Sequence, residues 1–269
     1  MATIRLLGAV AAADRTHDVH GRDASPRRLA LIALFAIARH NGVERERAAG
    51  LLWKRESALA AREKLDRLVR ALREDLGHRA VIDAGDVMRL DTESVSVDVV
   101  EFETACDAGD LEHAAAIYEG EFLEGFFLED AVEFEQWASD QRIRLTGRVA
   151  AVISHLATIA RDRGETQRLI ELLRRRAELE PYAAAPTLAL MHALEASGDA
   201  HDALRAGRMY ESRIRTFLET DPAAEVLAET RRLRAIVGPA ATPANGAVVP
   251  GVAVGVAGVT GEKAAGETR

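Results

Sequence analysis

The run ALAAREKLDRLVRALREDL, residues 58–76, decides the fold that we predict for the first half of the chain. Leucines recur along it at intervals of three or four residues, at Leu65, Leu68, Leu72 and Leu76. Because an α-helix turns once in about 3.6 residues, these leucines share one face, and charged side chains fill the opposite face. The pattern predicts a helix over Ala58–Leu76 that is buried on one side and open to a partner on the other.

The residues before this helix predict a strand and two shorter helices. Apolar residues partly alternate in the run from Ile4 to Val10, which favours a strand. Ser25-Pro26 is a good helix start, because Ser25 can cap the helix, and Asn41-Gly42 is a stop signal. A second helix is expected over about Glu44–Trp53.

The residues after this helix predict a β-hairpin. Gly77 ends the helix, and two short apolar runs, Ala80–Ile82 and Val87–Leu90, flank the turn Asp83–Asp86. A strand, three helices and a hairpin in this order are typical of a winged helix-turn-helix domain.

The second half of the chain predicts stacked helix pairs. Asp98 and Glu101 have the spacing of a capping box, which favours a helix start at residue 98. A glycine followed by an acidic residue then recurs before apolar helical runs, at Gly109-Asp110, Gly164-Glu165 and Gly198-Asp199. The last two lie 34 residues apart, which is the tetratricopeptide period. We therefore expect a mainly α fold, in which the winged helix is followed by an all-helical, tetratricopeptide-like domain.

An insertion, Glu121–Leu145, separates the first helical unit from the next and holds the densest aromatic group of the chain. These aromatics could line a ligand pocket or fill the joint between helical units, and the second interpretation is favoured because large aromatics mostly serve burial. They are Phe122, Phe126, Phe127, Phe134 and Trp137. The many acidic residues of the insertion are interpreted as a solvated face, since nothing places two of them around a cleft.

Charge is divided unevenly along a chain whose net charge is −8. Residues 1–95 contain 17 Lys and Arg against 14 Asp and Glu, whereas residues 96–237 contain 16 against 27. The first part has a net positive charge and can approach a polyanion, whereas a polyanion would repel the acidic second part. We therefore predict domains over 1–95 and 96–237, followed by a Gly/Ala/Val/Pro-rich tail over 238–269 that we expect to be disordered.

Several other features narrow the class of protein. The single cysteine, Cys106, excludes an internal disulfide and fits a reducing cytoplasm. No run reaches the roughly 18–20 uninterrupted apolar residues of a membrane span, so no membrane contact is expected. The sequence has no phosphate-binding glycine loop, catalytic motif or metal-ligand spacing. We therefore predict no cofactor, no metal and no enzymatic activity.

Short phrases follow one another over about residues 26–236, and none of them is specific alone. Among them are Leu51-Leu52-Trp53, Val97-Asp98-Val99, Tyr118–Leu123, Phe134–Trp137 and Glu180-Pro181-Tyr182. Their order and spacing together resemble the bacterial transcriptional activator domain, a family that includes the antibiotic-regulatory activators of the SARP class.

The resemblance implies a winged helix like that of response-regulator effectors, whose third helix enters the major groove of double-stranded DNA. In this chain that helix is Ala58–Leu76. The loop Trp53–Ser57 matches a segment that in related effectors can touch RNA polymerase. The helical domain would support a homodimer and transcriptional activation.

Basic residues on the third helix and at the start of the first are the candidate DNA contacts. They are Arg62, Lys64, Arg67, Arg70, Arg73, Arg27 and Arg28. Arginine can read guanine through two hydrogen bonds. The alternative interpretation is a solvated helix face with internal ion pairs four residues apart, Glu63–Arg67 and Arg70–Glu74.

Two functions of different classes stay open. One is a cytoplasmic, DNA-binding transcriptional regulator that acts as a dimer and places the Asp83–Asp86 turn near the DNA backbone. The other is a protein-interaction scaffold with a vestigial winged helix, which binds a protein partner in the groove of its helical domain. Five basic against four acidic residues on the third helix do not decide between them.

Overall fold

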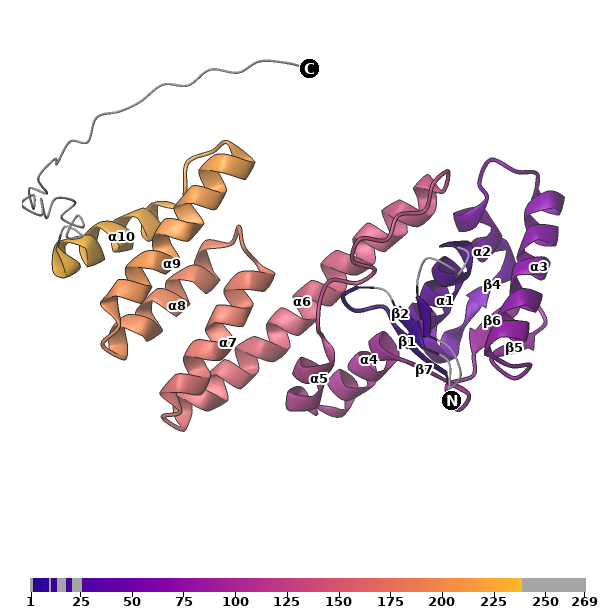
Figure 1. Cartoon of the computed structure of the whole chain (residues 1–269), viewed down its shortest axis with the longest axis horizontal. Helices are drawn as coiled ribbons and strands as arrows, with labels where there is room; N and C mark the ends of the chain where they lie inside the picture. Colours follow the sequence, from indigo (N-terminus) through magenta and orange to yellow (C-terminus); the bar gives the residue numbers. More distant parts are fainter. Residues whose placement is uncertain (1, 10, 14–17, 21–25, 239–269) are drawn as a thin grey trace, which may run out of the picture.

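The structure is a computed structural model that describes residues 2–9, 11–13, 18–20 and 26–238. An α+β unit lies at one end, the long helix α6 (Val132–Asp162) crosses the molecule, and shorter helices form an array at the other end (Figure 1). The fold is the expected one, a winged helix followed by a helical domain. The predicted Ser25 cap and the tail beyond Gly238 lie outside the described residues.

Two small sheets belong to the α+β unit. Their strands are β1 (Ala2–Arg5), β2 (Ala11–Ala13), β3 (Asp18–His20), β4 (Val43–Glu44), β5 (Val81–Ala84), β6 (Val87–Leu90) and β7 (Val95–Val97). The first sheet has the order β3-β2-β1-β7, with β7 parallel to β1, and the second has the order β4-β6-β5. The antiparallel pair of β5 and β6 is the predicted hairpin, which is therefore confirmed.

Four helical segments complete the α+β unit. They are α1 (Pro26–Ala38), the 3-10 turn η1 (Arg39–Asn41), α2 (Arg45–Leu52) and α3 (Ala58–Leu76). Helix α3 has the predicted bounds, and the Ser57 hydroxyl caps it by accepting from the Ala60 N–H at 3.3 Å. Its buried face differs from the prediction, because Val69 rather than Leu68 lies in the core. Leu68 and Leu76 are only half-buried, since they lie at the edge of the stripe.

The helical domain consists of antiparallel helices joined at the predicted turns. Its elements are α4 (Asp98–Ala108), α5 (Leu111–Ile117), α6, α7 (Thr166–Leu179), α8 (Ala184–Ala196), α9 (Ala200–Arg213), the π-helical turn η2 (Ile214–Leu218) and α10 (Ala224–Val237). Gly109, Gly164 and Gly198 connect α4 to α5, α6 to α7 and α8 to α9, with φ angles of 75°, 71° and 90°. Glycine tolerates this left-handed conformation best, so the recurring turn signal is confirmed.

Asp98 does not form the predicted capping box. Its carboxylate accepts hydrogen bonds from the backbone N–H groups of Leu6 and Leu7 at 2.9 Å, and from that of Val99 at 2.7 Å. Burial raises the pKa of Asp98, although these three N–H groups and the nearby Arg5 act to lower it. Leu6 and Leu7 donate to Asp98, and β1 ends at Arg5, earlier than the predicted strand. Beyond it Leu7 and Ala9 form only isolated bridges, to Phe122 and Glu124, and Val10 lies outside the described residues.

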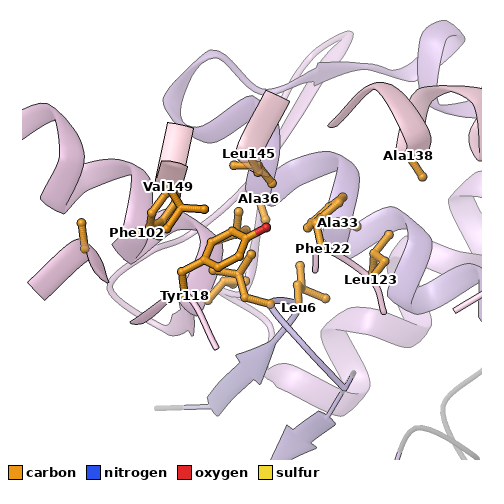
Figure 2. Packing of buried hydrophobic residues seen from close by; sticks show 14 of the residues in the cluster. Leu6, Ala33, Ala36, Phe102, Tyr118, Phe122, Leu123, Ala138, Leu145 and Val149 are labelled. Atoms are coloured by element: carbon orange, nitrogen blue, oxygen red, sulfur yellow. The ribbon is translucent and has the colours of Figure 1, made fainter. Parts of the chain in front are cut away.

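The hydrophobic core runs without interruption from the α+β unit into the helical domain. Leu6, Ala33 and Ala36 meet Phe102, Tyr118 and Phe122 in one cluster (Figure 2). The chain between α5 and α6 returns along the N-terminal segment, where Gly8 N–H donates to the Glu121 carbonyl at 2.9 Å and Leu123 N–H donates to that of Leu6 at 2.7 Å. The first sheet and the first helix pair are therefore packed as one body.

The aromatic insertion fills this joint rather than a joint between helical units, which corrects the prediction. Phe122 and Phe134 are fully buried, and Trp137 is half-buried at 6.1 Å from the Phe122 ring. Trp137 also lines a cavity together with Leu34 and Val87 of the α+β unit. Phe127 is 67% exposed and takes no part in the joint.

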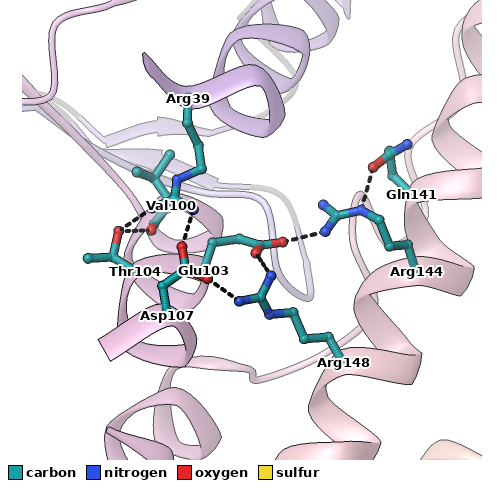
Figure 3. A network of polar contacts seen from close by, with 8 residues as sticks. All are labelled: Arg39, Val100, Glu103, Thr104, Asp107, Gln141, Arg144 and Arg148. Carbon is teal, nitrogen blue, oxygen red and sulfur yellow. Dashed lines mark hydrogen bonds and ion pairs between the residues drawn. The ribbon is translucent and has the colours of Figure 1, made fainter. Parts of the chain in front are cut away.

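A polar network also connects the two parts (Figure 3). Glu103 of α4 has a side chain that is only 5% exposed, and it pairs with Arg144 at 2.7 Å and with Arg148 at 2.5 Å, both from α6. Asp107 pairs with Arg148 and, at 2.5 Å, with Arg39 of η1. The hydrogen bonds and charges of these two arginines lower the pKa of Asp107. The network therefore links η1, α4 and α6 across the predicted domain boundary.

The division of the chain near residue 95 stays a prediction. β7 belongs to the first sheet, and α4 follows it directly. Among the described residues, α6 alone is long and apolar enough to span a membrane by length and composition. Its apolar residues, among them Phe134, Leu145 and Val149, are in the core described above.

We expect Asp98→Ala to lower the free energy of unfolding by about 2–4 kcal/mol, because it leaves two buried N–H groups without an acceptor. Chemical denaturation measures this change. Asp110→Ala is the matched control, since Asp110 only caps α5 at an exposed site, and it should cost about 1 kcal/mol. Equal losses in the two variants would mean that Asp98 does not tie the two parts together.

Replacing Arg144 and Arg148 together by Ala should cost about 3 kcal/mol of stability, because Glu103 is left buried without a partner. Adding Glu103→Leu should recover part of the loss, since no charge is then buried. The pair Arg161→Ala and Arg163→Ala removes two arginines that are each at least 65% exposed, and it serves as the control. A loss no larger than in this control would contradict the role of the network.

Candidate nucleic-acid interface

The outward face of α3 carries three of the predicted DNA contacts. Arg62, Arg67 and Arg70 are exposed there. The alternative interpretation required the pairs Glu63–Arg67 and Arg70–Glu74, and neither is among the ion pairs of the residues that the structure describes. Arg70 Nε instead donates to the Asp66 carbonyl, at a long distance of 3.4 Å. These arginines are therefore available to an external partner.

Two further predicted contacts on α3 are held by protein groups. Lys64 Nζ pairs with Glu56 at 2.5 Å, and both side chains are a little more than one-third exposed. Arg73 donates to the Val81 carbonyl at 3.0 Å and lies 3.8 Å from Asp83. Arg73 thus joins α3 to the first strand of the hairpin. Among the described residues, Arg73 is therefore less available to an external partner than Arg67.

The predicted contacts at the start of α1 lie beside α3. Arg28 forms an ion pair with Asp75. The Arg27 guanidinium lies over the Trp53 ring, with 5.9 Å between its Cζ atom and the ring centroid. Trp53, directly after the last residue of α2, is itself buried. The structure therefore brings Arg27 and Arg28 next to Lys64 and Arg67 of α3.

Arg45 is a residue of this surface that the sequence analysis missed. It lies at the start of α2, pairs with Asp66 of α3 at 2.5 Å, and also pairs with Asp83 of the hairpin. Its Nε donates to the Gly85 carbonyl at 3.2 Å. One guanidinium therefore pairs with two carboxylates and joins α2, α3 and the hairpin. No local spacing connects residues 45, 66 and 83, so the sequence contained no signal for it.

Two pockets flank α3, and their charges differ. The pocket on the α1 side, about 610 Å³, is lined by five cationic side chains and the carboxylates of Glu56 and Asp130. The pocket between α2, α3 and the hairpin turn, about 690 Å³, is lined by three cationic side chains and four carboxylates. The electrostatic attraction for an anion is therefore stronger on the α1 side.

The helical domain has a groove of its own, about 250 Å³ in volume, between α7, α8 and α9. Leu190, Leu194 and Met209 give it an apolar surface. Arg174, Arg205 and Arg213 also line it, in a domain that is otherwise strongly acidic. Among the described residues, no group of three or more His, Cys, Asp and Glu side chains could hold a metal ion.

A winged helix with outward arginines, continued by stacked helix pairs, defines a class of bacterial transcriptional regulators. The chain belongs to the bacterial transcriptional activator domain family, whose profile matches residues 92–234. The match begins just before β7 and extends into α10. It confirms the family that the sequence phrases indicated.

A solved structure with the same fold is that of Mycobacterium tuberculosis EmbR in complex with a low-affinity phosphopeptide. The TM-score is 0.57 at 21% sequence identity, and the similarity covers 87% of this chain and 65% of that one. The chain thus spans slightly less than two thirds of the length of EmbR. No curated protein sequence matches the chain.

We expect Arg45→Ala to destabilise the hairpin, because Asp66 and Asp83 then lose the cation between them. The loss should be about 2 kcal/mol, as for hydrogen bonds to charged groups. Amide hydrogen exchange in β5 and β6 should become faster than in the wild type, and exchange in α1 should change less. Arg47→Ala, an exposed arginine on the same helix, is the control. Unchanged exchange in the hairpin would show that Arg45 does not hold it.

Proposed function

We propose that the protein is a DNA-binding transcriptional regulator that acts as an activator and places α3 in the major groove. The observation that carries this proposal is the outward face of α3, where Arg62, Arg67 and Arg70 are exposed. In winged helix-turn-helix proteins the second helix of the motif lies in the major groove. Arginines on that helix can read guanine and contact phosphate.

The loop Trp53–Ser57 is proposed to contact RNA polymerase. It connects α2 to α3, and all of it except Trp53 is exposed. Arg55 of this loop lies 3.7 Å from Asp130, which precedes α6, and the exposed side chains of Phe127 and Val132 lie on either side of Asp130 in the chain. The proposed contact surface therefore draws on both parts of the molecule.

A homodimer in the cytoplasm completes the proposal. Two copies would bind two half-sites about 34–36 Å apart, or a multiple of that spacing, if their recognition helices lie on one side of the duplex. The family is one of transcriptional regulators, and we propose that this chain likewise acts without catalysing a reaction.

A protein partner in the helical groove is a second proposed function. The apolar surface from Leu190, Leu194 and Met209 supports it, because Met209 is 49% exposed although it is a large apolar side chain. Such a partner is compatible with DNA binding, since the groove lies in the array at the far end of α6 from α3 (Figure 1).

Replacing Arg67 and Arg70 together by Ala should weaken DNA binding and leave the fold intact. Duplexes that bind the purified wild-type chain are first selected from a random pool, and affinities are then measured over a range of salt concentrations. The slope of log affinity against log salt should fall by roughly 0.9 for each DNA phosphate that the variant no longer neutralises. Where one arginine reads a base, discrimination at that position should also relax.

The control for this variant is Arg161→Ala with Arg163→Ala, which removes the same charge from the helical domain. It should leave DNA affinity and the salt slope nearly unchanged. A wild-type chain that selects no duplex even at low salt would refute the regulator and favour the scaffold. Equal affinities of wild type and variant would refute only the assignment of these two residues.

A further inference from the structure

The pocket on the α1 side of α3 has a strongly cationic lining. It lies between the start of α1, the end of α2, the loop to α3, and α3 itself. Five basic side chains from these elements line it against two carboxylates. The cations are Arg27, Arg28, Arg55, Lys64 and Arg67, and the carboxylates are Glu56 and Asp130.

Three of these cations have protein partners. Lys64 pairs with Glu56, Arg55 lies 3.7 Å from Asp130, and Arg28 pairs with Asp75. These pairs use both carboxylates of the pocket and one from α3. An ion that enters the pocket therefore meets no unneutralised negative charge in its lining.

Arg27 and Arg67 are different, because neither forms an ion pair with any residue in the part of the chain that is described. Arg27 Nε is buried and has no hydrogen-bond acceptor. Its guanidinium is held over Trp53, which limits the directions in which it can point. A buried donor without an acceptor is unfavourable, so an anion that accepts from Arg27 Nε–H would be stabilising here.

The hairpin side of α3 offers no comparable site. The pocket there includes the carboxylates of Glu44, Glu46 and Asp86, and the turn Asp83–Asp86 contains no cation. Arg45, the cation nearest to this turn, is already paired with Asp66 and Asp83. A phosphate at the hairpin turn would therefore be repelled by the carboxylates near it, because the turn has no cation of its own to offset them.

We propose that the α1-side pocket binds a phosphate group, and that this phosphate is a backbone phosphodiester of the DNA strand beside α3. This inference rests on the proposed function, because DNA bound to α3 would supply the phosphate. It departs from the expectation that the Asp83–Asp86 turn lies near the DNA backbone. Arg27 and Arg67 supply the donors, Trp53 orients Arg27, and the paired cations around them supply positive potential.

The test uses the full chain and Arg27→Gln, which keeps a stem over Trp53 but removes the charge. With a selected duplex at about 0.1 M salt, this variant should bind roughly tenfold more weakly, and its salt slope should fall by about 0.9. Arg55→Gln is a second variant at a 78% exposed position, where folding is not at risk, and its salt slope should fall in the same direction. Arg79→Gln, an exposed arginine beyond the end of α3, is the matched control.

Uncharged methylphosphonates, placed one at a time along the duplex, identify the source of the phosphate. At one position of the duplex, a methylphosphonate should lower the affinity of the wild type and leave the affinity of Arg27→Gln unchanged. Inorganic phosphate alone forms the other arm, and it is followed through the Arg27 Nε–H resonance. A phosphate-dependent shift without any methylphosphonate effect would keep the site and overturn DNA as the source.

The remaining outcomes separate this inference from the proposed function. A wild type that binds DNA, with no effect of Arg27→Gln, no methylphosphonate position and no phosphate-dependent shift, would overturn the pocket alone. A wild type that binds no duplex would refute the regulator, and the phosphate arm would still decide whether the pocket binds an anion. Loss of affinity in Arg79→Gln equal to that in Arg27→Gln would also overturn the pocket, because the effect would then be one of general charge.

Discussion

The burial of one carboxylate determines how the two halves of this molecule meet. Asp98 begins the first helix of the second half, and it binds the backbone N–H groups of Leu6 and Leu7, directly after the first strand of the first half. Its two acceptor oxygens end β1 after Arg5 and direct the following residues toward the segment Tyr118–Ala131. The buried aromatics then complete a core to which both halves contribute. The polar network around Glu103 strengthens the same joint on its other side.

Local sequence signals predicted the elements well, because each depends on residues that are neighbours in the chain. The leucine spacing predicted α3, the apolar runs around Asp83–Asp86 predicted the hairpin, and the recurring glycines predicted the helix turns. Contacts between distant residues could not be predicted in this way. The spacing of Asp98 and Glu101 favoured a capping box, yet Asp98 binds a segment more than 90 residues away, and Glu101 contacts His113 at 2.9 Å.

The candidate DNA-binding surface shows the same limit. Helical periodicity indicated that Arg67 and Arg70 face outward, and the structure shows both of them exposed. It placed Arg62 nearer the edge of the core, whereas the structure shows Arg62 exposed as well. It could not indicate that Arg73 donates to the backbone of the hairpin, or that Arg45 forms ion pairs with both Asp66 and Asp83. A simple count of bases and acids on α3 therefore underestimates its attraction for an anion. Asp66 and Asp75 are both compensated by arginines from other helices.

The length of α6 has a mechanical consequence. With 31 residues it is about 46 Å long. One end is fixed against α2, and the other carries α7 and the array that follows it. A rod of this length acts as a lever arm, so a tilt of about 5° at the fixed end would displace the far end by roughly 4 Å. If a partner applied a torque to the array, α6 would transmit it to the joint beside the winged helix with little bending.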